Sequence, residues 1–184
     1  MIGKLIEVRP ARRADADALC DAHVEGWRVG YRGLFADAYL DAAEFDATRR
    51  RNWRLGTWIG HAEQAMLAGV LDGRVLGFAH CGPERIDEGE SLTGRGEVFG
   101  FYLHPDAWGS GLAAALMLAS EEALRARGYT SAVLWVLRDN PRARTFYEKA
   151  GWTWTGRETL WAGPQMPGVP KPDPIAEVQY LREL

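Results

Sequence analysis

The order of the predicted elements indicates an α/β or α+β fold with a mixed sheet. Three observations lead to this expectation. Two apolar runs at 65–71 and 75–81 are joined through an Asp-Gly pair, a strong hairpin signal. Apolar residues recur at helical spacing over 111–127, and a glycine follows as the C-terminal stop. The run 131–137 is continuously apolar, as in a strand buried on both faces.

The first half of the chain predicts a strand followed by helices. Residues 4–9 alternate between apolar and polar and predict a strand that a proline closes. A helix then opens at Asp15 or Asp17 and ends near Gly30. Residues 37–56, rich in Arg and Ala, predict one or two further helices.

The second half predicts two more helices between strands. Residues 83–96 are polar and rich in glycine and predict a loop, and 97–103 predict the next strand. The long helix and the buried strand follow, and 141–150 predict a short helix that begins with a proline. The closing strands are predicted at 152–161 and 175–181, on either side of a proline-rich loop.

Length and composition fit one globular domain spanning residues 1–184, since a domain has roughly 150 residues. The formal net charge of −3 is unlike that of a non-specific nucleic-acid binder. No apolar run reaches the roughly 18 residues of a membrane span, and the N-terminus has no signal-peptide pattern. We therefore expect a cytoplasmic protein that binds neither nucleic acid nor membrane.

The cysteines and histidines predict no metal site, because neither type shows metal-ligand spacing. Cys20 and Cys81 lie far apart in the chain, as is usual for a protein of the reducing cytoplasm. His80 and Cys81 are neighbours in a predicted strand, so their side chains point to opposite faces. We therefore do not expect them to form a nucleophile pair.

A glycine-rich turn at residues 108–113 opens the long helix. It contains Gly109 and Gly111, which let a phosphate approach the free N–H groups of a helix N-terminus. The alternative is an ordinary turn. The same letters also match a dinucleotide fingerprint, with Asp139 as its ribose-binding acid. That interpretation is disfavoured, because five residues separate the strand from the first glycine and repeated strand-helix units are lacking.

A second motif places Asn140 before the short helix and Tyr147 two turns along it, on the same side. The simplest interpretations are an N-cap for Asn140 and a half-buried aromatic residue for Tyr147.

Together, the two motifs make the sequence similar to the GNAT superfamily of acetyl-CoA-dependent N-acetyltransferases. The resemblance extends over nearly the whole chain, from the first strand through the Asp-Gly hairpin to the last strand. It implies a mixed, mostly antiparallel sheet of six to seven strands, flanked by about four helices, with a splay between the fourth and fifth strands. The departure is Trp108, where the family usually has Gln or Arg.

The resemblance also implies a cofactor, a reaction and a set of site residues. The cofactor is acetyl-CoA, and the acceptor is a primary amine, on a small molecule or a peptide, that attacks the acetyl carbon directly. Tyr147 is implied as the acid that protonates the leaving thiolate. Pantetheine fills the splay by strand addition, and a backbone N–H near Leu103 polarises the thioester oxygen. The implied cofactor-binding residues are Phe101, Tyr102, Leu103, Trp108, Gly109, Ser110, Gly111, Leu112, Ala113, Ala114 and Asn140.

The base that deprotonates the amine is predicted to be Glu97, at the start of the central strand beside the splay. A solvated strand-end carboxylate, with a water chain as the base, is the alternative. Residues 48–54 form a basic run that is either a solvated helix face or a grip for an acidic acceptor or a phosphate. An aromatic group either packs in the core or lines the acceptor pocket: Trp27, Tyr31, Leu34, Phe35 and Tyr39.

Two functions from different classes follow from these motifs. The first is an N-acetyltransferase, which the presence of both Asn140 and Tyr147 favours. The second is a non-catalytic CoA-binding sensor or interaction module. The sequence does not identify the amine, and it leaves the oligomeric state open, a homodimer being one possibility.

Overall fold

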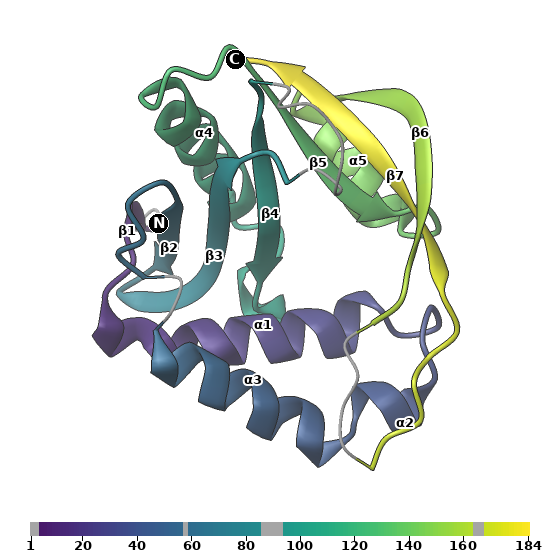
Figure 1. Ribbon diagram of the computed structural model, residues 1–184. Helices are drawn as coiled ribbons and strands as arrows, with labels where there is room; N and C mark the ends of the chain where they lie inside the picture. The colour runs from purple at the N-terminus through teal and green to yellow at the C-terminus, as the bar shows by residue number, and fades with distance from the viewer. Residues whose placement is uncertain (1–3, 57–58, 86–93, 164–167) are drawn as a thin grey trace.

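The computed structural model describes residues 4–56, 59–85, 94–163 and 168–184. Its centre is a seven-stranded sheet (Figure 1). Neighbouring described strands are antiparallel, except that β4 runs parallel to β5. The expected mixed, mostly antiparallel sheet is thereby confirmed. In sheet order the strands are β1 Ile6–Pro10, β2 Ala65–Leu71, β3 Arg74–Pro83, β4 Gly96–Leu103, β5 Ser131–Leu137, β7 Ile175–Glu183 and β6 Thr153–Trp161.

Helices pack on both faces of the sheet. The helices are α1 Ala16–Gly30, α2 Asp37–Leu40, α3 Ala43–Leu55, α4 Leu112–Arg125 and α5 Pro141–Lys149. Strand β2 shows how one strand serves two cores, because alternate side chains point to opposite faces. Met66 and Ala68 pack with α1 and α3, whereas Leu67 and Leu71 pack with α4. Two hydrophobic layers therefore hold the sheet between α1 and α4.

The predicted hairpin between β2 and β3 is confirmed. Asp72 and Gly73 have φ angles of 50° and 80°, as a two-residue turn with positive φ at both central positions requires. The Asp72 carboxylate also accepts a hydrogen bond from the backbone N–H of Leu5 at 2.9 Å. This turn sets the register of the first β2–β3 pairs, Leu71–Arg74 and Val70–Val75, before an irregularity between Gly69 and Val70 shifts the pairing that continues to Ala65–Cys81.

Strands β4 and β5 pair over three residues only, Gly96 to Val98 with Ala132 to Leu134. Beyond Val98 no β4–β5 pair follows, and the two strands diverge towards α1 in Figure 1. Strand β4 also bulges against β3, because Cys81 pairs with Val98 and His80 with Gly100, which leaves Phe99 as the extra residue. The expected splay between the fourth and fifth strands is thus present.

Element boundaries differ from expectation in small ways. Residues 37–56 form two helices, α2 and α3. Helix α4 ends at Arg125, and Gly128 adopts a φ of 90° in the turn that follows. Part of the predicted loop at 83–96, residues 86–93, lies outside the described residues.

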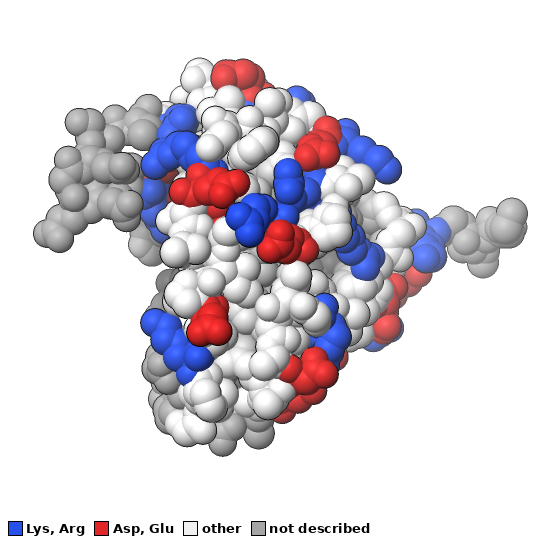
Figure 2. Space-filling view, turned by 90° about the vertical axis from the view of Figure 1, so that its right-hand side faces the viewer, with Lys and Arg blue, Asp and Glu red and all other residues white. Residues whose placement is uncertain are grey.

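One face of the molecule carries a mixture of charges. Acidic and basic side chains alternate over the side that includes β6 and β7, with uncharged surface between them (Figure 2). On this visible face the described residues form no continuous basic surface of the kind that nucleic acid needs.

Candidate active site

A cavity of about 950 Å³ lies where β4 and β5 diverge. We divide it into two halves by the helices that contribute to each. The α5 half is lined by Phe101, Trp108, Gly109, Gly111, Ala113, Ala114, Leu134, Val136, Asn140, Arg142, Ala143, Phe146 and Tyr147. The α1 half is lined by His23, Trp27, Tyr31, Arg49, Trp53, Phe78, His80, Arg85, Tyr102, Trp161 and Glu177.

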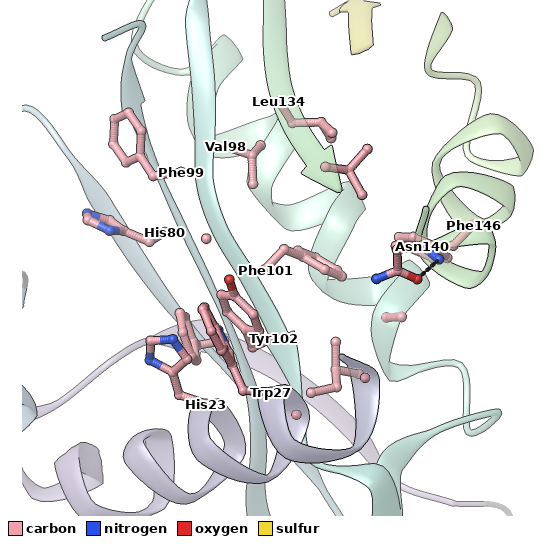
Figure 3. A pocket seen from close by; sticks show the side chains of 18 of the residues that line it. His23, Trp27, His80, Val98, Phe99, Phe101, Tyr102, Leu134, Asn140 and Phe146 are labelled. Atoms are coloured by element: carbon pink, nitrogen blue, oxygen red, sulfur yellow. Dashed lines mark hydrogen bonds between the residues drawn. The ribbon is translucent and has the colours of Figure 1, made fainter. Parts of the chain in front are cut away.

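Neighbouring side chains of β4 point to opposite faces of the strand and so enter different halves. Phe101 lies on the α5 side and stacks on Phe146 at a centroid distance of 5.6 Å. Tyr102 points the other way, towards α1, and stacks on His23 at 4.6 Å. Figure 3 shows Phe101 between the diverging strands and Tyr102 beside His23 and Trp27.

The glycine-rich turn lies at the N-terminus of α4. Gly109 and Gly111 have φ angles of 71° and 95°, which side-chain-bearing residues rarely adopt. A Cβ atom added to Gly109 would meet no atom within 4 Å in the described structure, so the turn presents open main chain. Ser110 stabilises it, because its hydroxyl donates to the carbonyl of Ala107 at 2.6 Å and accepts from the N–H of Leu112 at 3.1 Å. Such a turn fits a phosphate group.

Helix α5 borders the same half with Asn140 at its start. The Asn140 Oδ1 accepts a hydrogen bond from the N–H of Ala143 at 3.1 Å, so the expected N-cap is present (Figure 3). Tyr147 is 7% exposed and lines the cavity on the same helix. Burial raises the pKa of the Tyr147 hydroxyl, and the nearby Tyr102 adds to the rise. Tyr147 therefore keeps its proton at neutral pH.

Aromatic rings form the wall of the α1 half. Trp27 lies 5.6 Å from Trp161 and 4.8 Å from Tyr31, measured between ring centroids. The hydroxyl groups of Tyr31 and Tyr102 lie 3.5 Å apart. Of the predicted aromatic group, Trp27 and Tyr31 line the cavity, whereas the other three residues pack in or against the hydrophobic core: Leu34, Phe35 and Tyr39.

Two histidines of the α1 half are held neutral. Burial lowers the pKa of His80 to about 4, and its ring forms a 2.7 Å hydrogen bond with Gln64. Burial also lowers the pKa of His23, whose Nδ1 accepts from the indole of Trp53 at 3.3 Å. Cys81 lies in the core on the α4 side, away from His80, with its thiol pKa raised to about 11 by burial. The expected separation of this pair is confirmed.

The two carboxylates near the splay have different surroundings. Glu97 is 1% exposed and does not line the cavity. It accepts hydrogen bonds from Arg85, at 2.8 Å from the backbone N–H and 3.1 Å from Nε, and a further short one from the guanidinium. Glu177 lines the cavity, and burial raises its pKa to about 7; Arg85 opposes the rise and Glu97 adds to it. Among the described lining residues, Glu177 is the one with a carboxylate.

The predicted basic run separates into two environments. Arg49 lines the cavity, with its guanidinium carbon 5.3 Å from the centroid of Trp27. Arg50 points away and pairs with Asp21 at 2.9 Å. The side chains of Arg51 and Arg54 lie outside the described residues.

The structure brings most of the sequence-predicted site residues to one cavity. Ten line it: Phe101, Tyr102, Leu103, Trp108, Gly109, Gly111, Ala113, Ala114, Asn140 and Tyr147. Ser110, Leu112 and Glu97 do not. Sequence reasoning missed Glu177 and Arg142. Arg142 had a local signal, since it stands two residues after Asn140 on a short helix, whereas Glu177 had none.

The described residues contain no group of three or more His, Cys, Asp or Glu side chains that could hold a metal ion. No helix in the described part of the chain is long and apolar enough to cross a membrane. Cys20 and Cys81 are free and buried.

Comparison with known proteins places this cavity in context. A sequence model described as "Acetyltransferase (GNAT) family" matches residues 24–152. An uncharacterized N-acetyltransferase of Archaeoglobus fulgidus is 32% identical over 74% of this chain and 87% of its own length. The uncharacterized N-acetyltransferase YuaI of Bacillus subtilis is 28% identical over 74% and 75%. The crystal structure of the PaiA N-acetyltransferase from Thermoplasma acidophilum in complex with coenzyme A has the same fold, with a TM-score of 0.72, 17% identity and coverage of 98% and 99%.

Proposed function

The chain belongs to the GNAT acetyltransferase family and is an acetyl-CoA-dependent N-acetyltransferase, and from this premise we propose that its cavity holds acetyl-CoA in the α5 half and the amine in the α1 half. The observation that carries the proposal is the continuity of the cavity, which runs from the glycine turn of α4 through the splay to Glu177. We further propose that one domain spans the chain and that it acts in the cytoplasm, where thiols such as Cys20 and Cys81 stay reduced.

The residues of the α5 half fit the cofactor. The open main chain at Gly109, in a turn where Gly111 also has a positive φ angle, suits the pyrophosphate. Beyond Val98, β4 no longer pairs with β5, and this edge of the strand offers main-chain groups to the two amides of pantetheine, as in strand addition. Phe101 and Leu103, which belong to that part of β4 and line the cavity, flank the pantetheine in this proposal. When bound, acetyl-CoA supplies the acetyl thioester that the amine attacks.

Tyr147 is the proposed proton donor to the leaving group. Its hydroxyl keeps a proton at neutral pH because burial raises its pKa. A donor needs that protonated state at the start of each turnover. Asn140 supports this role by fixing the start of α5, the helix that presents Tyr147.

Glu177 is the proposed base, in preference to the sequence-predicted Glu97. Glu177 lines the half in which the amine enters, and a pKa of about 7 allows it to accept a proton near neutral pH. Glu97 is occupied by hydrogen bonds from Arg85 and lies outside the lining. His80, with a pKa of about 4, holds a proton poorly at neutral pH.

The α1 half suits a small amine with an apolar or planar body. The rings of Trp27, Tyr31 and Trp161 provide flat walls, and aromatic faces also attract an ammonium group before it loses its proton. Neither nucleic acid nor membrane is needed as a partner.

A thiol-release assay with acetyl-CoA and a panel of aliphatic, aromatic and peptide amines tests this function. Release of CoA that depends on an amine, with the acetylated amine found by mass spectrometry, is the expected result. Calorimetric binding of acetyl-CoA with no amine-dependent release across the panel would favour the non-catalytic CoA-binding module. Absence of acetyl-CoA binding would contradict both.

A further inference from the structure

The first position of the glycine turn lacks the charge that a phosphate site usually supplies. Trp108 stands there, and its side chain is uncharged. Its single polar hydrogen is also used within the protein, because the indole Nε1 donates to the carbonyl of Leu103 at 3.3 Å. Trp108 therefore offers a ligand in the cavity an aromatic face but no side-chain hydrogen-bond donor.

A cation from another element covers that face. The guanidinium carbon of Arg142 lies 3.4 Å from the centroid of the Trp108 ring, and both residues line the cavity with Gly109 and Gly111. Stacking engages the flat face of a guanidinium and leaves the N–H groups at its edge for hydrogen bonds. The Arg142–Trp108 stack thus brings a positive charge from α5 to the turn of α4.

The position of Arg142 is unfavourable for the helix itself. It lies in the first turn of α5, which contains no acidic residue, so its charge faces the positive end of the helix dipole. Partial desolvation of its guanidinium lowers its pKa although the residue as a whole is exposed, and the ion pairs in the described part of the chain include the nearby Arg138 but not Arg142. The neighbouring Arg144 differs, since it donates to the hydroxyl of Tyr180 at 3.0 Å and to the carbonyl of Arg138 at 3.1 Å.

We infer that Arg142, held on the face of Trp108, is a cofactor-binding residue that supplies the positive charge for the pyrophosphate of acetyl-CoA. The inference rests on the proposed function, because it requires acetyl-CoA in the α5 half. Trp108 is then a platform for the charge-bearing residue, and the charge usually present at the first position of the turn comes from a residue 34 positions later in the chain.

Calorimetric titration of acetyl-CoA into four variants tests this inference without using activity. Arg142→Ala weakens binding by roughly 10- to 100-fold, the range for loss of one charge-assisted hydrogen bond. Arg142→Lys, which keeps the charge but not the planar stack, lies between Arg142→Ala and the wild type. Arg138→Ala is the matched control, an arginine just before α5 that does not line the cavity, and its affinity stays at the wild-type value. The double variant Arg142→Ala, Trp108→Arg regains affinity, because it returns a charge to the turn.

Three further measurements separate the phosphate sources, test the role of charge and exclude a structural effect. The loss in Arg142→Ala is the same for CoA and 3′-dephospho-CoA if the pyrophosphate is the partner, and it vanishes with dephospho-CoA if the 3′-phosphate is. The difference from wild type shrinks as salt rises. Without ligand, the melting temperature of Arg142→Ala matches or exceeds that of the wild type, because a cation leaves the helix N-terminus.

The outcomes distinguish this inference from the proposed function. Wild-type affinity in Arg142→Ala, no recovery in the double variant, or a loss confined to CoA with its 3′-phosphate would overturn the pyrophosphate assignment and leave the acetyltransferase function intact. A wild-type protein that does not bind acetyl-CoA would overturn both.

Discussion

Arg85 surrounds the carboxylate of Glu97 with its backbone N–H, at 2.8 Å, and with its side chain, whose Nε donates at 3.1 Å. The same guanidinium stabilises the ionised form of Glu177 and so lowers its pKa, whereas the negative charge of Glu97 raises that pKa. One arginine therefore stands between two carboxylates, one of them enclosed and the other open to the cavity. This arrangement makes distinct predictions for the two acids.

Glu177→Gln lowers kcat/KM near neutral pH, because the amide cannot accept the proton of the amine. In the wild type, activity falls as pH drops through about 7, where Glu177 becomes protonated. The variant loses this acidic limb and recovers as rising pH provides free amine. A pH profile of kcat/KM measures both effects, with Glu158→Gln, an exposed β6 carboxylate outside the cavity lining, as the control. An unchanged profile would remove Glu177 from the mechanism.

Glu97→Gln shifts the acidic limb rather than removing it. The negative charge of Glu97 raises the pKa of Glu177, so its loss moves that pKa, and the limb, to lower pH. If Glu97 were itself the base, the same substitution would abolish the limb. The pH profiles of kcat/KM for Glu177→Gln and Glu97→Gln thus decide which carboxylate is the base. Circular dichroism checks that both variants fold.

Glu177→Gln also changes the pH dependence of stability. The pKa of Glu177 rises from 4.5 to about 7 on folding, so ionisation favours the unfolded state. The wild type loses stability as pH increases from about 4.5 to about 7, and the variant does not. We expect the variant to melt at a higher temperature than the wild type above pH 7 and at a similar temperature near pH 4. Parallel melting curves at every pH would contradict the raised pKa.

Tyr147→Phe lowers kcat by about 100-fold or more, the usual effect of removing a general acid. The ring still packs against Phe101 and Phe146, at 6.3 and 5.4 Å, so acetyl-CoA affinity changes little. Steady-state kinetics and calorimetry together provide the test. Unchanged turnover would leave Tyr147 with a packing role only.

Ala114→Glu prevents acetyl-CoA binding through charge and bulk at the glycine turn. Ala114 is exposed in the first turn of α4 and lines the cavity, where a carboxylate suits the helix dipole but repels a phosphate. Leu118→Glu, one turn along the same helix and also exposed, is the matched control. Substitution of Gly111 is a poorer test, because its φ of 95° strains any side-chain-bearing residue. Equal affinities of the two variants in calorimetry would contradict a phosphate site at the glycine turn.

Local chemistry in the sequence was sufficient to predict most helices and strands and most of the α5 half of the cavity. An Asp-Gly pair determines its own turn, Asn140 caps the helix it precedes, and glycines at 109 and 111 supply the positive φ angles of their turn. Each depends on residues a few positions apart, which periodicity and turn preferences describe. The resemblance to an acetyltransferase family rested on two such motifs and extended over nearly the whole chain.

Only the tertiary structure decided which side chains share the cavity. Glu177 reaches the cavity because β7 pairs with β5, which places it opposite Leu137, although the two residues lie 40 positions apart in the chain. Arg142 meets Trp108 because α5 packs beside the turn of α4. Glu97 is enclosed by Arg85, 12 positions earlier in the chain, so its apparent place beside the splay did not make it accessible. These relationships come from strand order, register and packing between distant segments, which no local pattern in the sequence encodes.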